Sequence, residues 1–289
     1  MAIWGSSFVV AKVGLREIGP LTLAGLRYFV AFLMLLPFLP HRLAAHGRPS
    51  RSLMVQLALL GISAYLVGNG CFFLALKVVP STTVSFLMGL IPILVLAGSL
   101  FWLKEGPTWW QAIGMVISLT GTALFFLPGV QAQSWRGFPI LGVGILGFGF
   151  FGLLSRSIAR ERKVDSLTLT AIPLAIGGGA LLAVALPLEG LPHLTLSGIG
   201  IVLLLALVNT AIAYLLYNHA LQSLTALQMN LVLNLSPFVT ALLAAVILGE
   251  ELTPVQWAGM VVATAGVALA QRGKITAAPP AASAPVARP

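Results

Sequence analysis

The sequence predicts an all-α polytopic membrane protein whose ten transmembrane helices form two inverted five-helix repeats. Its composition, the length of its apolar runs and an internal repeat support this prediction. Of the 289 residues, 58% are hydrophobic and 8% are charged, and the mean hydropathy is +1.01. Soluble domains carry about 25% charged residues, so this composition excludes a water-soluble fold. In lipid, only helices or a closed barrel can satisfy the backbone hydrogen bonds.

Ten apolar runs bounded by charge, Pro or Gly are the expected helices, because about 20 apolar residues cross a bilayer as a helix. In chain order they cover residues 1–18, 20–39, 53–76, 81–103, 108–127, 137–155, 166–187, 196–217, 223–248 and 254–271. The first five runs make a predicted repeat over residues 1–127, and the last five make a second over 137–271. Residues 272–289 are rich in Ala and Pro and predict a disordered tail.

The internal repeat appears when the sequence is shifted by 145 residues, which aligns 75–124 with 220–269 without a gap. Fourteen of these fifty positions are identical, including Pro92 with Pro237 and Glu105 with Glu250. A shared apolar bias does not explain matching Pro and Glu residues. Because each copy holds five spans, an odd number, the second copy is expected to cross the membrane in the opposite sense. Inverted repeats are typical of secondary transporters, whose substrate sites lie near the bilayer midplane between the repeats.

The net charge of +9 could indicate nucleic-acid binding, but the placement of the basic residues argues against it. Most Lys and Arg lie in short segments between apolar runs, where they orient helices. They gather on the side that carries both termini, which predicts cytoplasmic termini. All seven acidic residues fall at span ends or in loops, so no cluster for a metal, a cofactor or an active site is expected within the membrane.

Local motifs predict how several helices begin and pack. Thr108 with Gln111, and Thr253 with Gln256, have capping-box spacing. We interpret Glu105 and Glu250 as turn residues of a gate hairpin beside these helix starts rather than as catalytic acids. Two pairs of glycines are expected to let helices approach closely, and they are Gly114 with Gly121 and Gly259 with Gly266.

Pro92 and Pro237 lie near the middle of the fourth and ninth spans. Each removes one helix hydrogen bond and frees the carbonyl four residues earlier, at Met88 and Leu233. A packing kink is one interpretation. Since both copies carry the proline at the matching place, we favour hinges at Gly89, Pro92 and Pro237 beside a substrate cavity.

Polar and aromatic residues form matching stripes on several spans. Tyr65, Asn69 and Phe73 follow i, i+4, i+8 spacing, and the repeat offset relates them to Thr210, Tyr214 and Asn218. Helix–helix hydrogen bonding uses the same residue types and remains the alternative for any one residue. For the set we expect a central cavity lined by Trp4, Tyr65, Asn69, Phe73, Ser85, Met88, Asn209, Thr210, Tyr214, Asn218, Asn230 and Asn234.

Two residues of the first two spans keep two interpretations each. Trp4 fits either an aromatic belt at the membrane interface or the cavity. Arg27 is interpreted by default as an anchor that snorkels to the interface, and a contact with a substrate carboxylate is the alternative.

A set of short motifs resembles a known transporter family. The motifs are Trp4-Gly5-Ser6, Leu26-Arg27, Pro92 followed by Leu103-Lys104-Glu105, and Leu248-Gly249-Glu250. In this order, over residues 1–271, they resemble the EamA-type, ten-helix branch of the drug/metabolite transporter superfamily. The resemblance implies export of small metabolites or drugs across a bacterial inner membrane, with exporters of aromatic amino acids among the relatives.

Together these observations predict a monomeric exporter of neutral or aromatic amino acids that works by alternating access. An uncharged cavity of amides and rings suits a solute with an apolar or aromatic part. A carrier of nucleotide sugars or quaternary amines, and a membrane scaffold without transport, are the alternatives. We expect no metal, no cofactor and no enzymatic activity.

Overall fold

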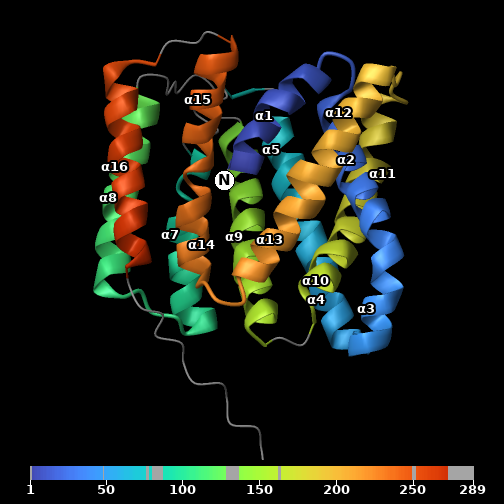
Figure 1. The fold of residues 1–289 in the computed structure, drawn as a ribbon, viewed down its shortest axis with the longest axis horizontal. Coiled ribbons are helices and arrows are strands. Elements are labelled where there is room, and N and C mark those ends of the chain that lie inside the picture. The colour runs from blue at the N-terminus through green and yellow to red at the C-terminus, as the bar shows by residue number, and fades with distance from the viewer. Residues whose placement is uncertain are drawn as a thin grey trace, which may run out of the picture.

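The computed structural model describes residues 2–47, 49–75, 78–79, 87–127, 137–161, 164–248 and 252–272. The regular structure in these ranges is helical, and the helices pack side by side, with α8 and α16 upright and α1, α12 and α13 slanted in Figure 1. The α-helices are α1 (Ala2–Gly14), α2 (Pro20–Leu35), α3 (Leu39–His46), α4 (Arg51–Gly61), α5 (Gly70–Ala75), α7 (Ile91–Gly98), α8 (Trp109–Phe126), α9 (Phe138–Glu161), α10 (Ser166–Pro173), α11 (Gly179–Glu189), α12 (Leu196–Ala206), α13 (Ala213–Ala220), α14 (Ala226–Leu233), α15 (Ser236–Leu248) and α16 (Pro254–Gln271). Short segments join some of these helices end to end, and they are the 3-10 turn η1 (Leu36–Phe38) and the π-helical segments η2 (Ile62–Asn69), η6 (Leu174–Gly178) and η7 (Leu207–Ile212). A further π-helical segment, η3 (Ser99–Leu103), extends α7 at its C-terminal end.

Within the described residues, six continuous helical stretches are long and apolar enough to cross a membrane, as expected for a multi-pass membrane protein. They are Pro20–Ala45, Arg51–Ala75, Trp109–Phe126, Phe138–Glu161, Ser166–Glu189 and Leu196–Ala220. Each contains most of one predicted run. The run predicted to end at residue 155 continues as helix to Glu161, because Arg156 is buried inside the protein instead of ending the span. The predicted tail lies outside the described residues except for Arg272.

Pro92 and Pro237 follow breaks in their spans, which is a stronger effect than the predicted kinks. The chain turns at Gly89–Leu90 and again at Asn234–Leu235, and the new helices α7 and α15 carry their prolines at the second position. The turns have matching hydrogen bonds 145 residues apart: Leu90 N–H to Leu87 O at 3.1 Å and Leu235 N–H to Val232 O at 3.2 Å. Proline has no N–H to bond the carbonyl four residues earlier, so the preceding helix does not continue through it, whereas in a first turn the missing N–H removes no helix bond.

The π-helical segments η2 and η7 begin 145 residues apart, at Ile62 and Leu207. In each, a polar side chain bonds to the carbonyl five residues earlier: Asn69 Nδ2 donates to Ala64 O at 2.8 Å, and Thr210 Oγ1 donates to Leu205 O at 2.9 Å. The i, i+4, i+8 face predicted from Tyr65 onwards assumed α-helical spacing, so it does not hold through η2. π-helical turns are rare and are frequent at functional sites.

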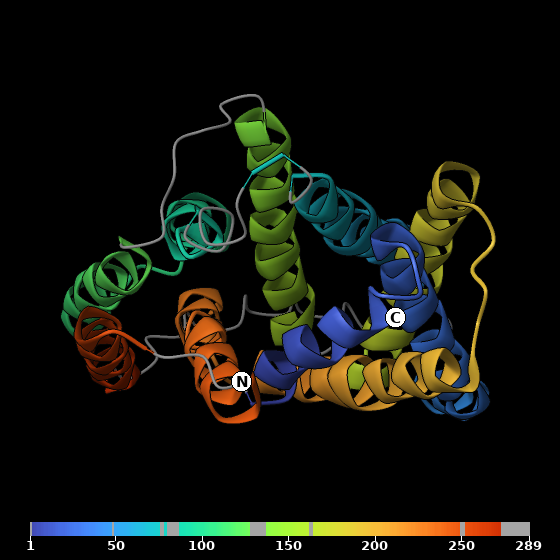
Figure 2. The ribbon, with the colours of Figure 1, turned by 90° about the horizontal axis from the view of Figure 1, so that it is seen from above.

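The glycines of α8 and α16 allow helices to approach closely, as predicted, and the structure shows that these two helices approach each other. A Cβ atom on Gly121 would overlap the backbone of Gly259 and Ala263, and one on Gly114 would overlap the backbone of Gly266. The two helices therefore touch backbone to backbone. Figure 2 shows this pair at one edge of the bundle, away from the group formed by α2, α10, α11, α12 and α13.

Candidate functional site

The four tyrosines of the chain meet in one place. With two further aromatic residues they form what we call the six-ring cluster, which consists of Trp4, Tyr28, Tyr65, Phe151, Tyr214 and Tyr217. Contacting rings have centroids between 4.5 and 6.4 Å apart, and Phe151 stacks on Tyr217 at an interplanar angle of 15°. The rings come from α1, α2, η2, α9 and α13, so three belong to each half of the chain.

The tyrosines of the cluster are buried, with between 1% and 8% of their surface exposed. Membrane proteins commonly place tyrosine in belts at the two interfaces with water. Here all four lie inside the protein, and Trp4 packs edge-on against Tyr214 and Tyr217. Of the two interpretations of Trp4, this geometry supports the one that turns it inward.

Arg27 lies beside the six-ring cluster and does not snorkel to the interface, so the default interpretation of this residue was wrong. Its Nε donates to Thr210 Oγ1 at 3.1 Å, one terminal nitrogen donates to Ser7 Oγ at 3.0 Å, and the other donates to the backbone oxygen of Asn209 at 3.4 Å. The guanidinium carbon also lies 5.1 Å from the centre of the Tyr28 ring, a cation–π contact. These contacts hold the side chain inside the bundle.

Several residues predicted to line a cavity lie in or next to this region. Tyr65 and Tyr214 belong to the cluster, and Phe73 packs against the same core. Asn209 donates to Ser6 Oγ at 3.1 Å and to the backbone oxygen of Ile3. Asn218 is 2% exposed and donates to Thr170 Oγ1 at 2.9 Å. In this conformation the rings of Tyr65 and Tyr214 contact each other, with centroids 5.5 Å apart, and the two asparagines bond to other residues of the bundle.

Other predicted cavity residues make their contacts elsewhere. Asn230 donates to Ala226 O of its own helix at 2.9 Å, and Asn234 donates to Thr122 Oγ1 of α8 at 3.2 Å. Met88 packs against a separate apolar group that contains Leu141. Ser85 lies outside the described residues.

One end of the bundle, which we call the Arg156 end, is joined by a buried ion pair. Arg156 Nε donates to Glu105 Oε1 at 2.9 Å, and one terminal nitrogen donates to Leu221 O at 2.6 Å. Arg160 lies 3.9 Å from the same carboxylate and donates to Leu103 O at 2.9 Å. Lys104 has a left-handed φ of 53° after η3, and Glu105 follows with its N–H bonded to Ser99 O. This turn brings the carboxylate to α9.

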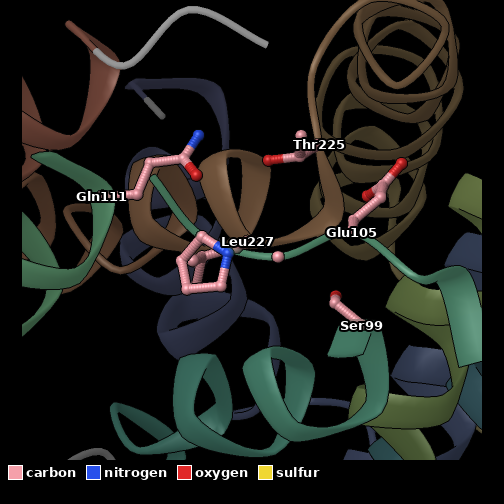
Figure 3. Close-up of a pocket in the computed structure, with 7 residues that line it drawn as sticks. Ser99, Glu105, Gln111, Thr225 and Leu227 are labelled. Atoms are coloured by element: carbon pink, nitrogen blue, oxygen red, sulfur yellow. The ribbon is translucent and has the colours of Figure 1, made fainter. Parts of the chain in front are cut away.

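A small cavity lies beside Glu105, lined by Ser99, Gln111, Thr225 and Leu227 among others (Figure 3). Its volume is about 10 Å³, so it is far too small for a solute. A larger cavity of about 210 Å³ between α7 and α9 is lined by Trp102 and Leu146 among others, and none of the described residues that line it is charged. Trp102 and Leu146 are 44% and 61% exposed, so this cavity opens on the outer face of the bundle.

The opposite end, which we call the Glu189 end, is joined by helix caps. Glu189 ends α11 and accepts from the backbone N–H groups of Leu21 at 3.1 Å and Thr22 at 2.8 Å, in the first turn of α2. Gly19 precedes this helix and has no side chain to cap it. Glu17 accepts from Thr195, the N-cap of α12. Each carboxylate thus binds the start of a helix from the other half of the chain.

Comparison with known proteins decides the family. A model of the EamA-like transporter family matches the chain twice, over residues 1–127 and 135–271. The chain belongs to the EamA-like transporter family. Members are membrane transporters rather than enzymes, and among the described residues no group of three or more His, Cys, Asp or Glu side chains could hold a metal ion.

Relatives of this EamA-like chain resemble it over nearly its whole length. YedA, an uncharacterized inner membrane transporter of Escherichia coli K12, is 29% identical over 94% of this chain and 88% of its own. A probable amino-acid metabolite efflux pump of Salmonella typhimurium is 26% identical over 92% of this chain and 90% of its own. The S-adenosylmethionine/S-adenosylhomocysteine transporter of Chlamydia muridarum is 26% identical over 87% of this chain and 83% of its own.

A solved crystal structure has the same fold as this EamA-like chain. The two agree with a TM-score of 0.76 at 18% sequence identity, and the match covers 94% of each chain. At this identity the likeness supports the fold alone.

The sequence did not predict three members of the six-ring cluster, which are Tyr28, Phe151 and Tyr217, or the buried ion pair between Arg156 and Glu105. Tyr217 follows Tyr214 by three residues on the same face, a signal that was available. Tyr28 and Phe151 have no such signal, because each joins the cluster only through helices distant in sequence. Arg156 was expected to lie just beyond a span, and only the packing of α9 reveals its bond to Glu105.

Proposed function

We propose that this protein exports neutral or aromatic amino acids, or similar small metabolites, across a bacterial inner membrane. The observation that carries the proposal is the six-ring cluster, to which both halves of the chain contribute three rings. Rings, hydroxyls and amides together favour a solute with an apolar or aromatic part and hydrogen-bonding groups. The printed names of the Salmonella and E. coli relatives support an amino-acid-related solute and an inner-membrane location.

The two halves are proposed to be inverted repeats of five spans each, over residues 1–127 and 137–271. The two matches to the family model support two such units. So do the breaks before Pro92 and Pro237, the starts of η2 and η7, and the glycines of α8 and α16, since each pair is related by 145 residues. Both termini, including the tail 272–289, would then be cytoplasmic, and the protein would function as a monomer.

Transport is proposed to follow alternating access, with the two ends of the bundle opening in turn. The cluster is packed in this conformation, so a path to it requires the helices of one end to separate. The breaks at Gly89, Pro92 and Pro237 would absorb this motion as hinges. Opening would turn the following residues to the solute: Trp4, Tyr65, Asn69, Phe73, Ser85, Met88, Asn209, Thr210, Tyr214, Asn218, Asn230 and Asn234.

A second candidate solute contains a nucleoside. The Chlamydia relative is named for S-adenosylmethionine and S-adenosylhomocysteine, and a flat adenine ring would stack on the same aromatic residues. A carrier of nucleotide sugars or quaternary amines, and a scaffold without transport, are further alternatives.

Uptake into proteoliposomes tests the proposal. We expect saturable flux of radiolabelled L-phenylalanine or L-leucine, and we expect Tyr214→Ala to reduce it at least tenfold by removing a central ring. Phe101→Ala is the matched control, because Phe101 is an aromatic residue that is 86% exposed on the outer surface. Absence of saturable flux for every neutral amino acid would contradict the proposal, and saturable flux of S-adenosylmethionine alone would favour the second candidate.

A further inference from the structure

We propose that Arg27 binds the carboxylate of the transported solute, while the six-ring cluster receives its apolar or aromatic body. This inference rests on the proposed function and deepens it by naming the solute class. The class is organic carboxylates that carry a ring or a bulky apolar group. The carboxylate is required for recognition, and the ammonium group of an amino acid is not.

The first argument is that, among the described residues, the charge of Arg27 has only neutral partners. Its acceptors are the hydroxyls of Ser7 and Thr210 and the backbone oxygen of Asn209. The ion pairs among the described residues involve Arg42, Arg156 and Arg160, and none involves Arg27. A charge inside a membrane span is costly, and such residues commonly mark the pathway of a substrate. An anionic group of a solute would neutralise this one.

The second argument is that Arg27 keeps donors for a ligand. A guanidinium has five N–H groups in a planar fork. The contacts with described residues use three of them, one from each nitrogen, which leaves one N–H on each terminal nitrogen. A carboxylate can accept from two terminal nitrogens at once, a geometry that a single ammonium group cannot offer.

The third argument is that each polar side chain that contacts Arg27 lies one helical turn from a ring of the cluster. On α1, Ser7 contacts Arg27 and Trp4 lies one turn before it. On η7 and α13, Thr210 contacts Arg27 and Tyr214 lies one turn after it. On α2 itself, Tyr28 is the next residue and lies beside the guanidinium. A solute with its carboxylate on Arg27 would therefore meet the rings with the rest of its body.

The same arrangement disfavours cationic solutes. Among the described carboxylates, Glu105 and Glu189 are engaged at the two ends of the bundle, and neither pairs with Arg27. The guanidinium would repel a quaternary amine placed in the cluster, and no opposite charge lies among these partners. The ring faces would attract the same cation, so competition by a quaternary amine distinguishes the two solute classes.

A panel of four related compounds tests the inference on the full-length protein. 3-Phenylpropanoate and L-phenylalanine carry the carboxylate, whereas L-phenylalaninamide and 2-phenylethylamine lack it. Competition with uptake into proteoliposomes gives one readout. Thermal stabilisation of the detergent-purified protein gives a second that does not depend on transport. We expect both carboxylates to compete and stabilise at concentrations about tenfold or more below those of the amide and the amine.

Variants then assign the preference to Arg27. Arg27→Gln should remove the preference for compounds with a carboxylate, so that these compounds and the amide act at similar concentrations. Arg27→Lys should keep a weakened preference, because the charge remains without the planar guanidinium fork. Arg16→Gln is the matched control, since it removes one exposed arginine from the turn after α1 and should leave the preference unchanged. If Arg27→Gln does not fold, the panel on the unaltered protein and on Arg27→Lys still decides the question.

The outcomes separate this inference from the proposed function. Flux of L-phenylalanine with equal competition by the amide would overturn the role of Arg27 and keep the function. Stabilisation by 3-phenylpropanoate that Arg27→Gln abolishes, without flux of any amino acid, would keep the site and overturn the function. If Arg27→Gln reduced the competition and stabilisation by all four compounds equally, Arg27 would be a structural residue and the inference would be overturned. No stabilisation by any compound together with no flux would overturn both the inference and the proposed function.

Discussion

The Arg156 end and the Glu189 end of the bundle both join helices through carboxylates, but they differ in burial and in partners. Glu105 and Arg156 have side chains that are 8% and 5% exposed and carry opposite full charges 2.9 Å apart. Glu189 is only partly buried and accepts from backbone N–H groups at the start of α2. The first contact is a desolvated ion pair, and the second is a helix cap.

This difference teaches how each end responds when its contact is broken. Separating a buried ion pair leaves a charge without compensation, so the free energy lost when the pair breaks is large. When a capping carboxylate leaves a helix start, water takes its place, so the free energy lost is small. Opening the Arg156 end therefore requires the charges to be hydrated, whereas the Glu189 end can open at lower cost.

The largest effect is expected from Glu105→Gln. This change leaves Arg156 buried beside a neutral amide and should lower the free energy of unfolding by about 3–5 kcal/mol. Equilibrium unfolding in mixed detergent measures it. Arg160→Gln is a suitable control, because the Arg160 side chain is 37% exposed. Its replacement should lower the free energy of unfolding much less than Glu105→Gln does. A Glu105→Gln protein as stable as the unaltered one would remove the contrast between the two ends.

Glu189→Gln should lower the free energy of unfolding by about 1 kcal/mol, because an amide keeps one acceptor for the N–H groups of α2 but loses the interaction of charge with the helix dipole. The same unfolding assay at low and high salt measures it. The loss should shrink in high salt, since this end is partly exposed. A loss equal to that of Glu105→Gln would mean that the ends are alike.

Glu17→Gln should change the free energy of unfolding by less than about 0.5 kcal/mol. Glu17 is exposed, and Thr195 still caps α12 through its bond from Gly198 N–H at 3.0 Å. Thr195→Val in the same assay should cost more, because it removes the cap itself. The reverse order would show that Glu17, and not Thr195, holds this helix start.

The double change Glu105→Leu with Arg156→Met should be close to neutral, although each single change is costly. Replacing both charges by apolar side chains of similar size removes the desolvation penalty together with the attraction. A double-mutant cycle measures the coupling. If the double variant is as unstable as Glu105→Gln, the bond from Arg156 to Leu221 O is the main contact of this end.

Features set by neighbouring residues could be predicted from the sequence. The capping boxes at Thr108 and Thr253 form as their spacing predicts, because a side chain at one helix start reaches the backbone three residues away. A third box, Thr225 with Gln228, has the same signature and was overlooked. That α8 and α16 would approach other helices closely at their glycines was also predictable, since only residues without a side chain allow contact between backbones, but the sequence did not show that the two helices meet each other.

Features that join distant segments could not be predicted in this way. Arg27 and Thr210 are 183 residues apart, and Arg156 and Glu105 are 51 apart. A charged residue in an apolar run reads as an anchor at the interface until its partners are known. The register of η2 was likewise missed, because the choice between α and π turns depends on what packs against the helix.

The sequence by itself determined that the chain lies in a membrane. It also determined where most helices begin and end, and which residues the two halves of the chain share. These properties follow from hydropathy, local capping and the internal repeat, which neighbouring or aligned residues encode. Only the tertiary structure decided that four tyrosines converge, that Arg27 lies beside them with neutral partners, and that the two ends are joined by unlike contacts. Each of these depends on which helices become neighbours, and that is decided by packing over the whole chain.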